Sequence, residues 1–326
     1  MNTYTFKKSL INIFTLIVSL IVIFVLLELG LRLKNYLIID YDVEMWRYSK
    51  NLKIEHQNKS INHIHIKNSS SKLQNVEINI NSLGMRGKED DINEWQFAEK
   101  KLLFIGSSIM LGWGVEDKDV LNKVLEREAQ KNNLNWKTLN AAVGNYNTER
   151  YVSNFFEFHT KLQPDIILIQ YFINDAEKLS SNKGNFFTRN FHLGVMLWRY
   201  FSLFKDDMQK ENIEDFYKKV YSLEKKEKTV KSNLNRLNKY CVDQDIRCIL
   251  IFTPDIELIQ SGNDLNFIND YIYEIANEIE MELFDLSKIM KIYLNQNLTN
   301  KKYNDRHPNS LAHRIIGEEL FKFLIN

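Results

Sequence analysis

From Lys101 onwards, the sequence alternates short apolar runs with longer stretches of helical periodicity. The apolar runs have the length and the Ile and Leu content of buried strands. Strands that alternate with helices predict a parallel sheet with helices on both faces, in which ligands bind at the carboxyl ends of the strands. We expect strands at Leu102–Ile105, Thr138–Val143, Ile166–Ile169, Ile249–Phe252 and Leu283–Leu286, and helices at Val120–Gln130, Thr148–Leu162, Asn266–Glu280 and from Ser310.

An uncharged run, Leu10–Leu27, precedes this alternation. A membrane-spanning helix needs about 20 mostly apolar residues, and Leu29–Leu31 extend the run past Glu28. The competing interpretation is a cleaved signal peptide, which would have an apolar region of about 7–15 residues and a small-residue cleavage site. Basic residues flank both ends, and the short basic N-terminal tail favours a cytoplasmic position. We predict a transmembrane signal anchor within residues 1–34, with the large domain outside the cytoplasm.

The polar residues 35–100 are predicted to form a connector with an edge hairpin. Val76–Asn81 alternates as a short strand does, and Asn81–Gly87 is rich in turn residues. Residues 101–326 then form the α/β domain, with an insertion at about residues 176–245. Its first part, Phe186–Phe204, is dense in aromatic side chains, which either pack the insertion onto the core or form a lid or wall over an apolar site. Its second part, Ile213–Tyr240, is predicted to be one long charged helix.

Charge and cysteine content exclude several classes of function. Lys plus Arg number 43 and Asp plus Glu 42, so the basic excess of a nucleic-acid-binding protein is absent. Cys241 and Cys248 are spaced as neither a zinc site nor a redox pair. They are either free buried thiols or, in an oxidising compartment, a disulfide. We predict no metal and no cofactor, and the oligomeric state stays open.

Two polar elements far apart in the sequence carry the candidate chemistry. Gly106-Ser107-Ser108 follows the first predicted strand, which places the Ser108 hydroxyl at the carboxyl edge of the sheet. A serine hydroxyl becomes a nucleophile when a base takes its proton. His307 precedes a proline on the loop into the last helix, and Asp305 lies two residues before it. A carboxylate beside a catalytic histidine can orient the imidazole and stabilise the imidazolium.

Two further elements could stabilise an oxyanion. Asn174 follows the third strand, and its side-chain amide can donate hydrogen bonds. The turn at Gly144-Asn145 follows the second strand and could present a backbone N–H. Each element alone is a common loop signal. All of them are expected at one edge of the sheet, where a nucleophile, a base and an oxyanion hole must meet.

With these elements in this order, residues 100–326 resemble the SGNH, or GDSL-like, hydrolase family. The resemblance implies a three-layer α/β/α, flavodoxin-like fold with Ser108 as nucleophile and second oxyanion donor, Asn174 as oxyanion donor, His307 as base and Asp305 as acid. The sequence departs from the family pattern at Ser107, where the family has aspartate, and at the second block, where the usual glycine position falls on Asn145.

The resemblance implies a serine carboxylic ester hydrolase anchored in the membrane. Its expected partner is an acylated glycan or lipid of the cell surface, with an acetyl group as the single preferred acyl group, and no nucleic acid. Two alternatives remain: an O-acyltransferase that uses the same residues, and a non-catalytic membrane-anchored binding or assembly protein on a degenerate SGNH fold.

Overall fold

The computed structural model describes residues 3–179, 184–205, 212–263, 265–301 and 305–326. It has two compact units, each described here by itself. The helical unit is Met1–Arg47 with Asn182–Asp206, and the sheet unit is Tyr48–Ser181 with Asp207–Asn326.

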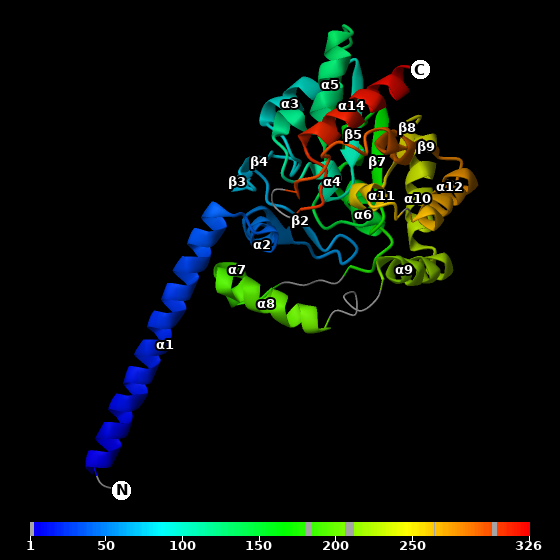
Figure 1. The fold of residues 1–326 in the computed structure, drawn as a ribbon. Coiled ribbons are helices and arrows are strands. Elements are labelled where there is room, and N and C mark those ends of the chain that lie inside the picture. Colours follow the sequence, from blue (N-terminus) through cyan, green and yellow to red (C-terminus); the bar gives the residue numbers. More distant parts are fainter. Residues whose placement is uncertain (1–2, 180–183, 206–211, 264, 302–304) are drawn as a thin grey trace. The chain divides into compact units, whose positions relative to one another are not determined.

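The sheet unit is built on a five-stranded parallel sheet in the order β6-β5-β7-β8-β9 (Figure 1). Every neighbouring pair in it is parallel. β5, β7 and β8 form the interior of the sheet, and their apolar side chains are buried on both faces, as expected for a parallel sheet. The predicted parallel sheet is therefore confirmed. Its strands are β5 (Lys100–Ile105), β6 (Trp136–Asn140), β7 (Ile166–Phe172), β8 (Arg247–Thr253) and β9 (Glu282–Asp285).

Helices cover both faces of this sheet, which confirms the predicted three-layer α/β/α arrangement. On one face, Leu103 and Ile105 share a hydrophobic cluster with residues of α6, α10 and α12. On the other, α5 and α14 pack side by side (Figure 1). The helices of this unit are α3 (Glu89–Trp95), α4 (Ser108–Leu111), α5 (Leu121–Lys131), α6 (Thr148–Phe158), α9 (Ile213–Glu227), α10 (Thr229–Asp243), α11 (Ile256–Gln260), α12 (Asn266–Glu278), α13 (Leu286–Ile292) and α14 (Ser310–Ile325), with short 3-10 turns at Asp117–Asp119 and Thr160–Leu162.

The connector contains two antiparallel hairpins. The first pairs β1 (Lys53–Glu55) with β2 (His63–His65), and the second pairs β3 (Ser69–Leu73) with β4 (Val76–Ile80). The predicted strand at Val76–Asn81 corresponds to β4, whereas the first hairpin was not anticipated. The turn-rich Asn81–Gly87 returns the chain to the sheet, because the Arg86 N–H donates to the Asn140 carbonyl at the end of β6 (3.0 Å).

The predicted single helix at Ile213–Tyr240 is wrong: the chain forms two helices, α9 and α10. The break is at Lys228, whose left-handed backbone (φ 56°) cannot continue a right-handed helix. The open question about the cysteines is also answered, because Cys241 at the end of α10 forms a disulfide with Cys248 in β8.

The helical unit contains α1 (Thr3–Leu37), the start of α2 (Tyr41–Leu52), α7 (Phe186–Asn190) and α8 (His192–Lys205). Within α1, Lys7–Leu37 is the one helix in the described part of the chain that is long and apolar enough to cross a membrane. The aromatic part of the predicted insertion lies in this unit, where Phe191 packs edge-on against Phe24 of α1 (ring centroids 5.1 Å). Residues 180–183 and 206–211 of the insertion lie outside the described residues.

The break at Lys228 yields a stability prediction. Glycine adopts left-handed dihedrals without the strain that a side chain brings, so Lys228→Gly should leave the free energy of unfolding unchanged or raise it by up to about 1 kcal/mol. Lys225→Gly, a matched change inside the exposed last turn of α9, should lower it by about 1 kcal/mol. Urea unfolding of the full chain in detergent micelles compares the two. Equal destabilisation by both changes would contradict the role given to Lys228.

Candidate active site

Ser108 is the first residue of α4, directly after β5. The end of β5 lies close to β7, because a Cβ on Gly106 would lie 2.9 Å from the Cβ of Gln170 on β7. Ser107 is buried and donates both its backbone N–H and its hydroxyl to Gln170 Oε1 (3.1 and 3.0 Å). Glycine and a small serine therefore let β5 end against β7, which places Ser108 at the carboxyl edge of the sheet.

The Ser108 hydroxyl lies 2.7 Å from Nε2 of His307, which is 199 positions further along the chain. The other ring nitrogen of His307, Nδ1, lies 2.6 Å from Oδ1 of Asp305. With Nδ1 protonated and Nε2 accepting from the hydroxyl, both contacts are satisfied. A hydroxyl, an imidazole and a carboxylate in one hydrogen-bonded chain form the type of arrangement that proteins use for nucleophilic acyl transfer.

Asp305 is held as a carboxylate although it is buried. Burial alone would raise its pKa, but hydrogen bonds from the His307 ring, the His307 backbone N–H (3.0 Å) and Gln74 outweigh burial and lower the pKa of Asp305. Gln74 lies in the turn between β3 and β4, and its Nε2 donates to Asp305 Oδ2 at 2.6 Å. The second hairpin of the connector therefore contacts Asp305 directly.

The loop that carries His307 is fixed on both sides. The Asn300 N–H donates to the His307 carbonyl (3.0 Å). Asn309 caps α14, because its side chain accepts from the N–H groups of Leu311 and Ala312 (3.0 and 3.1 Å). The position predicted for His307, on the loop entering the last helix, is the one observed.

Asn145 and Asn174 follow the two strands that flank β5. β6 and β7 are the neighbours of β5 in the sheet, so the ends of all three strands meet at one edge. Asn145 has a left-handed backbone (φ 64°), which asparagine tolerates. In the described structure, hydrogen bonds join Ser108, His307 and Asp305 into one chain, and Asn145 and Asn174 follow the strands on either side of β5.

The sequence suggested the backbone N–H of Gly144 as an oxyanion donor, but this N–H is engaged in another hydrogen bond. Its N–H donates to the hydroxyl of Tyr48 (2.9 Å), and that hydroxyl in turn lies 2.7 Å from His65 Nε2. His65 Nδ1 completes the chain at the Gly84 carbonyl (3.1 Å). Of the two backbone N–H groups considered at this turn, the one at Asn145 is the better candidate for an oxyanion donor.

The carbonyl of Gly144 is held as firmly as its N–H. Lys53 Nζ donates to it at 2.8 Å, and His63 Nε2 lies 3.1 Å away. Burial lowers the pKa of His65 to about 3 and that of His63 to about 2, so both rings are neutral at pH 7. Burial, with the charge of Arg150, lowers the pKa of Lys53 to about 7. The first hairpin and Tyr48 thus clamp Gly144, the residue before Asn145, through its backbone N–H and its carbonyl.

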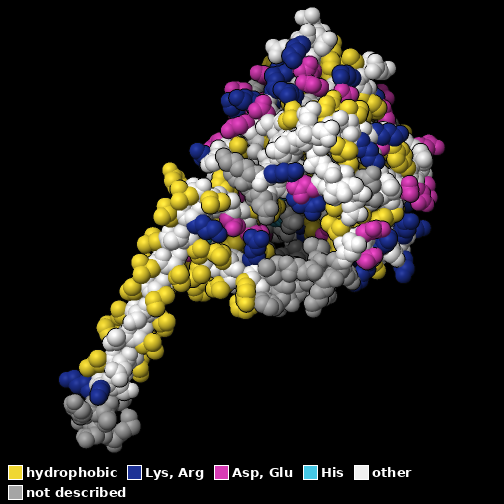
Figure 2. Space-filling view, viewed as in Figure 1, with side chains coloured by type: hydrophobic (Ala, Val, Ile, Leu, Met, Phe, Trp, Pro, Cys, Tyr) yellow, Lys and Arg dark blue, Asp and Glu magenta, His cyan; other side chains and the backbone are white. Residues whose placement is uncertain are grey.

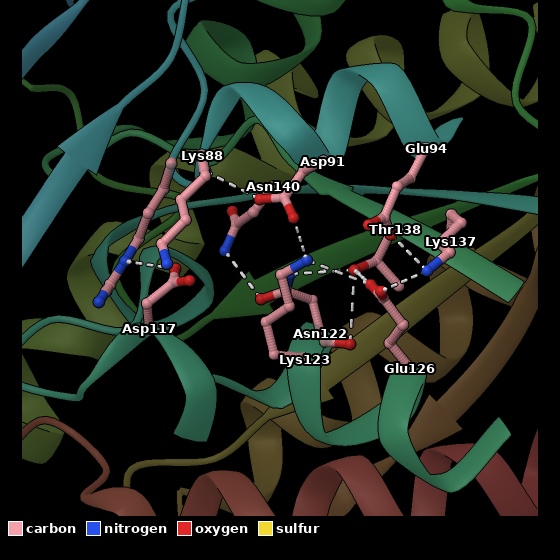
Figure 3. A network of polar contacts seen from close by, with 11 residues as sticks. Lys88, Asp91, Glu94, Asp117, Asn122, Lys123, Glu126, Lys137, Thr138 and Asn140 are labelled. Carbon is pink, nitrogen blue, oxygen red and sulfur yellow. Dashed lines mark hydrogen bonds and ion pairs between the residues drawn. The ribbon is translucent and has the colours of Figure 1, made fainter. Parts of the chain in front are cut away.

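Side-chain hydrogen bonds to backbone carbonyls in and after α4 form a second clamp. The buried Arg86 guanidinium donates to the carbonyls of Leu111 and Gly112 (both 2.6 Å) and of Val115 (2.5 Å). Asn140 Nδ2 donates to the Met110 carbonyl at 2.8 Å. These bonds satisfy carbonyls that the end of a short helix leaves unpaired. Figure 3 shows the polar network that continues from Asn140 to Asn122, Thr138, Glu126, Lys123 and Asp91.

Sequence reasoning did not single out Gln74, Arg86 or Gln170. Gln170 had a signal, because it is a polar residue in the middle of an otherwise apolar buried strand. Arg86 lies in the turn-rich stretch that was noted without a role. For Gln74 the sequence offered no signal, since its partner is 231 positions away. In the described part of the chain, no cluster of three or more His, Cys, Asp or Glu side chains could hold a metal ion.

No family model and no curated protein matches the chain. Among solved structures, it is similar to a protein described as lipolytic and of the G-D-S-L family from Desulfitobacterium hafniense DCB-2, at 15% identity and a TM-score of 0.43, covering 69% of this chain and 99% of that one. It is also similar to the acetyl-xylooligosaccharide esterase Axe2 from Geobacillus stearothermophilus, at 17% identity and a TM-score of 0.45, covering 69% and 94%. A third is the acetyl xylan esterase AlAXEase, at 16% identity and a TM-score of 0.44, covering 69% and 99%. These similarities concern the fold.

The contact between Gln74 and Asp305 yields a prediction. Gln74→Glu keeps the size of the side chain but replaces the donor with a carboxylate. Two carboxylates at this distance repel, so the pKa of Asp305 should rise and His307 should lose its orienting partner. If the site hydrolyses p-nitrophenyl acetate as proposed below, the rate should fall by roughly tenfold at pH 7.

Glu77→Gln on β4 is the control. It interconverts the same two residue types at an exposed position and should leave the rate unchanged. A Gln74→Glu protein as active as the unmodified chain would show that this contact does not support Asp305.

The burial of His65 yields a pH prediction. Because its folded pKa of about 3 lies below the value of 6.5 for a free histidine, the unfolded chain binds a proton between these pH values and the folded chain does not. The stabilisation linked to neutral His65 is therefore fully present above pH 6.5 and is lost as the pH falls below this value. Between pH 6.5 and 4.5, protonation of His65 in the unfolded chain should lower the free energy of unfolding by about 2–3 kcal/mol. His65→Gln should abolish this part of the decrease.

Urea midpoints across this range, measured on the full chain in micelles, test this effect. His56→Gln, at a half-buried histidine that lies outside the Gly144 clamp, serves as control. Parallel pH curves for the His65→Gln and unmodified proteins would refute it.

Proposed function

We propose that this protein is a membrane-anchored serine ester hydrolase. The observation that carries the proposal is the hydrogen-bonded chain from Ser108 through His307 to Asp305, with 2.7 and 2.6 Å between the paired atoms. Both distances are within hydrogen-bond reach, as required between a nucleophile, its base and the group that orients the base.

In the proposed reaction, Ser108 Oγ attacks the acyl carbonyl while His307 Nε2 takes the hydroxyl proton. The tetrahedral oxyanion accepts hydrogen bonds from the backbone N–H groups of Ser108 and Asn145 and from the Asn174 amide. His307 then gives its proton to the leaving alcohol, and an acyl-serine remains. Water attacks this ester while His307 takes a proton from the water. When the second intermediate collapses, the acid is released and His307 returns that proton to Ser108 Oγ. Asp305 stabilises the imidazolium in both halves.

The proposed location follows from α1. Its apolar side chains are exposed along the helix, for example Leu16, Leu20 and Leu26 at 60%, 57% and 63%. A helix of that length left in water would expose large apolar side chains along its whole surface, which a bilayer removes from water. We place the N-terminal tail in the cytoplasm and the site outside it.

The proposed substrates are acylated glycans or lipids of the cell surface. An anchored site meets substrates that are themselves fixed at or near the membrane. An acetyl group is the acyl group that we expect the enzyme to remove. Transfer of the acyl group to a sugar hydroxyl would use the same residues. Free acetate measured against newly acetylated glycan separates hydrolysis from transfer.

The catalytic assignment is tested with a fluorophosphonate probe and with p-nitrophenyl acetate. Ser108→Ala should abolish labelling and lower the rate at least about 10³-fold, and His307→Gln should lower it comparably. Asn174→Ala should keep measurable labelling and lower the rate about 10²-fold.

Ser107→Ala is the matched control, because it removes the neighbouring hydroxyl, which bonds to Gln170 and not to His307. It should still be labelled. Absence of labelling in the unmodified chain would instead favour a non-catalytic binding or assembly protein.

A further inference from the structure

We propose that α7 and α8 form a second membrane contact, with the exposed apolar face of α8 embedded where the lipid headgroups meet the acyl chains. This inference rests on the membrane anchoring proposed above. It assigns a lipid bilayer as the partner of a surface whose side chains would otherwise be left in water.

The first observation is the junction between α8 and α1. Both oxygens of Glu28 accept hydrogen bonds from the first N–H groups of α8, those of His192 and Leu193 (both 3.0 Å). Arg32 pairs with Glu28 at 2.7 Å and also donates to the Asn190 carbonyl. An unpaired carboxylate at the end of an apolar helix would be costly in lipid, whereas the start of a helix offers unpaired donors and a positive dipole end. The start of α8 is thus fixed to α1.

The second observation is the level of this junction along α1. A helix rises 1.5 Å per residue, so the twenty residues from Leu10 to Leu29 match an apolar bilayer core of about 30 Å. Glu28 then lies close to the boundary of that core. Phe191 packs against Phe24, one turn deeper. Interfacial helices lie about 5–10 Å into this boundary, which agrees with the depth at which α8 begins.

The third observation is the two-sided character of α8. Its opposite face is occupied within the helical unit: Val195 is buried, Trp198 packs edge-on against Trp46 (5.3 Å) and Arg199 pairs with Asp42 (2.8 Å). The exposed face is apolar and has the spacing i, i+1, i+4, i+5 of a single helical stripe. Its members are Met196, Leu197, Tyr200 and Phe201, which are 41%, 49%, 56% and 61% exposed.

The exposed apolar surface also continues beyond α8. Phe186 and Phe187 of α7 are 68% and 57% exposed. Figure 2 shows hydrophobic side chains along α1 and over α7 and α8. Contiguous apolar patches are rare on protein surfaces that face water and mark interaction sites. This patch adjoins α1, which we propose to span the bilayer. We therefore assign the bilayer as the partner of the patch.

The proposal is tested with an environment-sensitive nitrobenzoxadiazole label on single introduced cysteines. The two native cysteines form a disulfide, so an introduced thiol is the one that reacts. Phe201→Cys tests α8, and Phe97→Cys is the matched control, an exposed phenylalanine of the sheet unit. Val18→Cys reports on α1 itself. The full-length proteins are reconstituted into phosphatidylcholine vesicles with or without phosphatidylcholine brominated on its acyl chains.

We expect the label at position 201 to be quenched by brominated lipid and to be several-fold less sensitive to aqueous iodide than the label at position 97. Iodide sensitivity equal to that of position 97 would overturn the proposal. Protection from iodide without quenching by brominated lipid would also overturn it, in favour of contact with a second copy. If position 18 is quenched by brominated lipid and position 201 is not, only this inference fails. If neither is quenched, the membrane anchoring itself fails.

Discussion

The position of β5 between β6 and β7 is the constraint on which the rest of the site depends. Parallel strands end at the same edge, so the residues that follow these three strands must converge there. Ser108 follows the middle strand, and Asn145 and Asn174 follow its neighbours. The order of the strands therefore directs the segments that carry Ser108, Asn145 and Asn174 to one edge of the sheet. His307 and Asp305 complete the group from the loop before α14.

The connector does more than separate two parts of the chain. Its second hairpin brings Gln74 to Asp305, and the following turn brings Arg86 to the end of α4. Its first hairpin, with Tyr48, holds the backbone N–H and the carbonyl of Gly144. Short loops at a sheet edge have few contacts of their own, so precise placement requires support from a surrounding shell. In this protein much of that shell comes from residues that precede the sheet in the sequence.

The sequence predicted the sheet well and its supporting shell poorly. The β7 run Ile166–Ile169 is a local signal, because burial on both faces leaves an unbroken apolar stretch. The positions of Ser108 and His307 at the ends of predicted elements were equally readable. The contact from Gln74 to Asp305 depends on tertiary packing, and no local pattern encodes it. The single helix expected at Ile213–Tyr240 was wrong because its apolar period continues through Lys228, and only the left-handed backbone at that residue separates α9 from α10.

The distance along the chain between Ser108 and His307 sets the order of events during synthesis. His307 follows Ser108 by 199 residues. At roughly 5–20 residues per second, the base is added about 10–40 s after the nucleophile, and α1 is made before either. A nascent chain can therefore enter the membrane while its serine still lacks a base. The proposed activity would begin only once the segment before α14 has been translated and folded against α4, so that an incomplete chain cannot cleave esters on its way to the membrane.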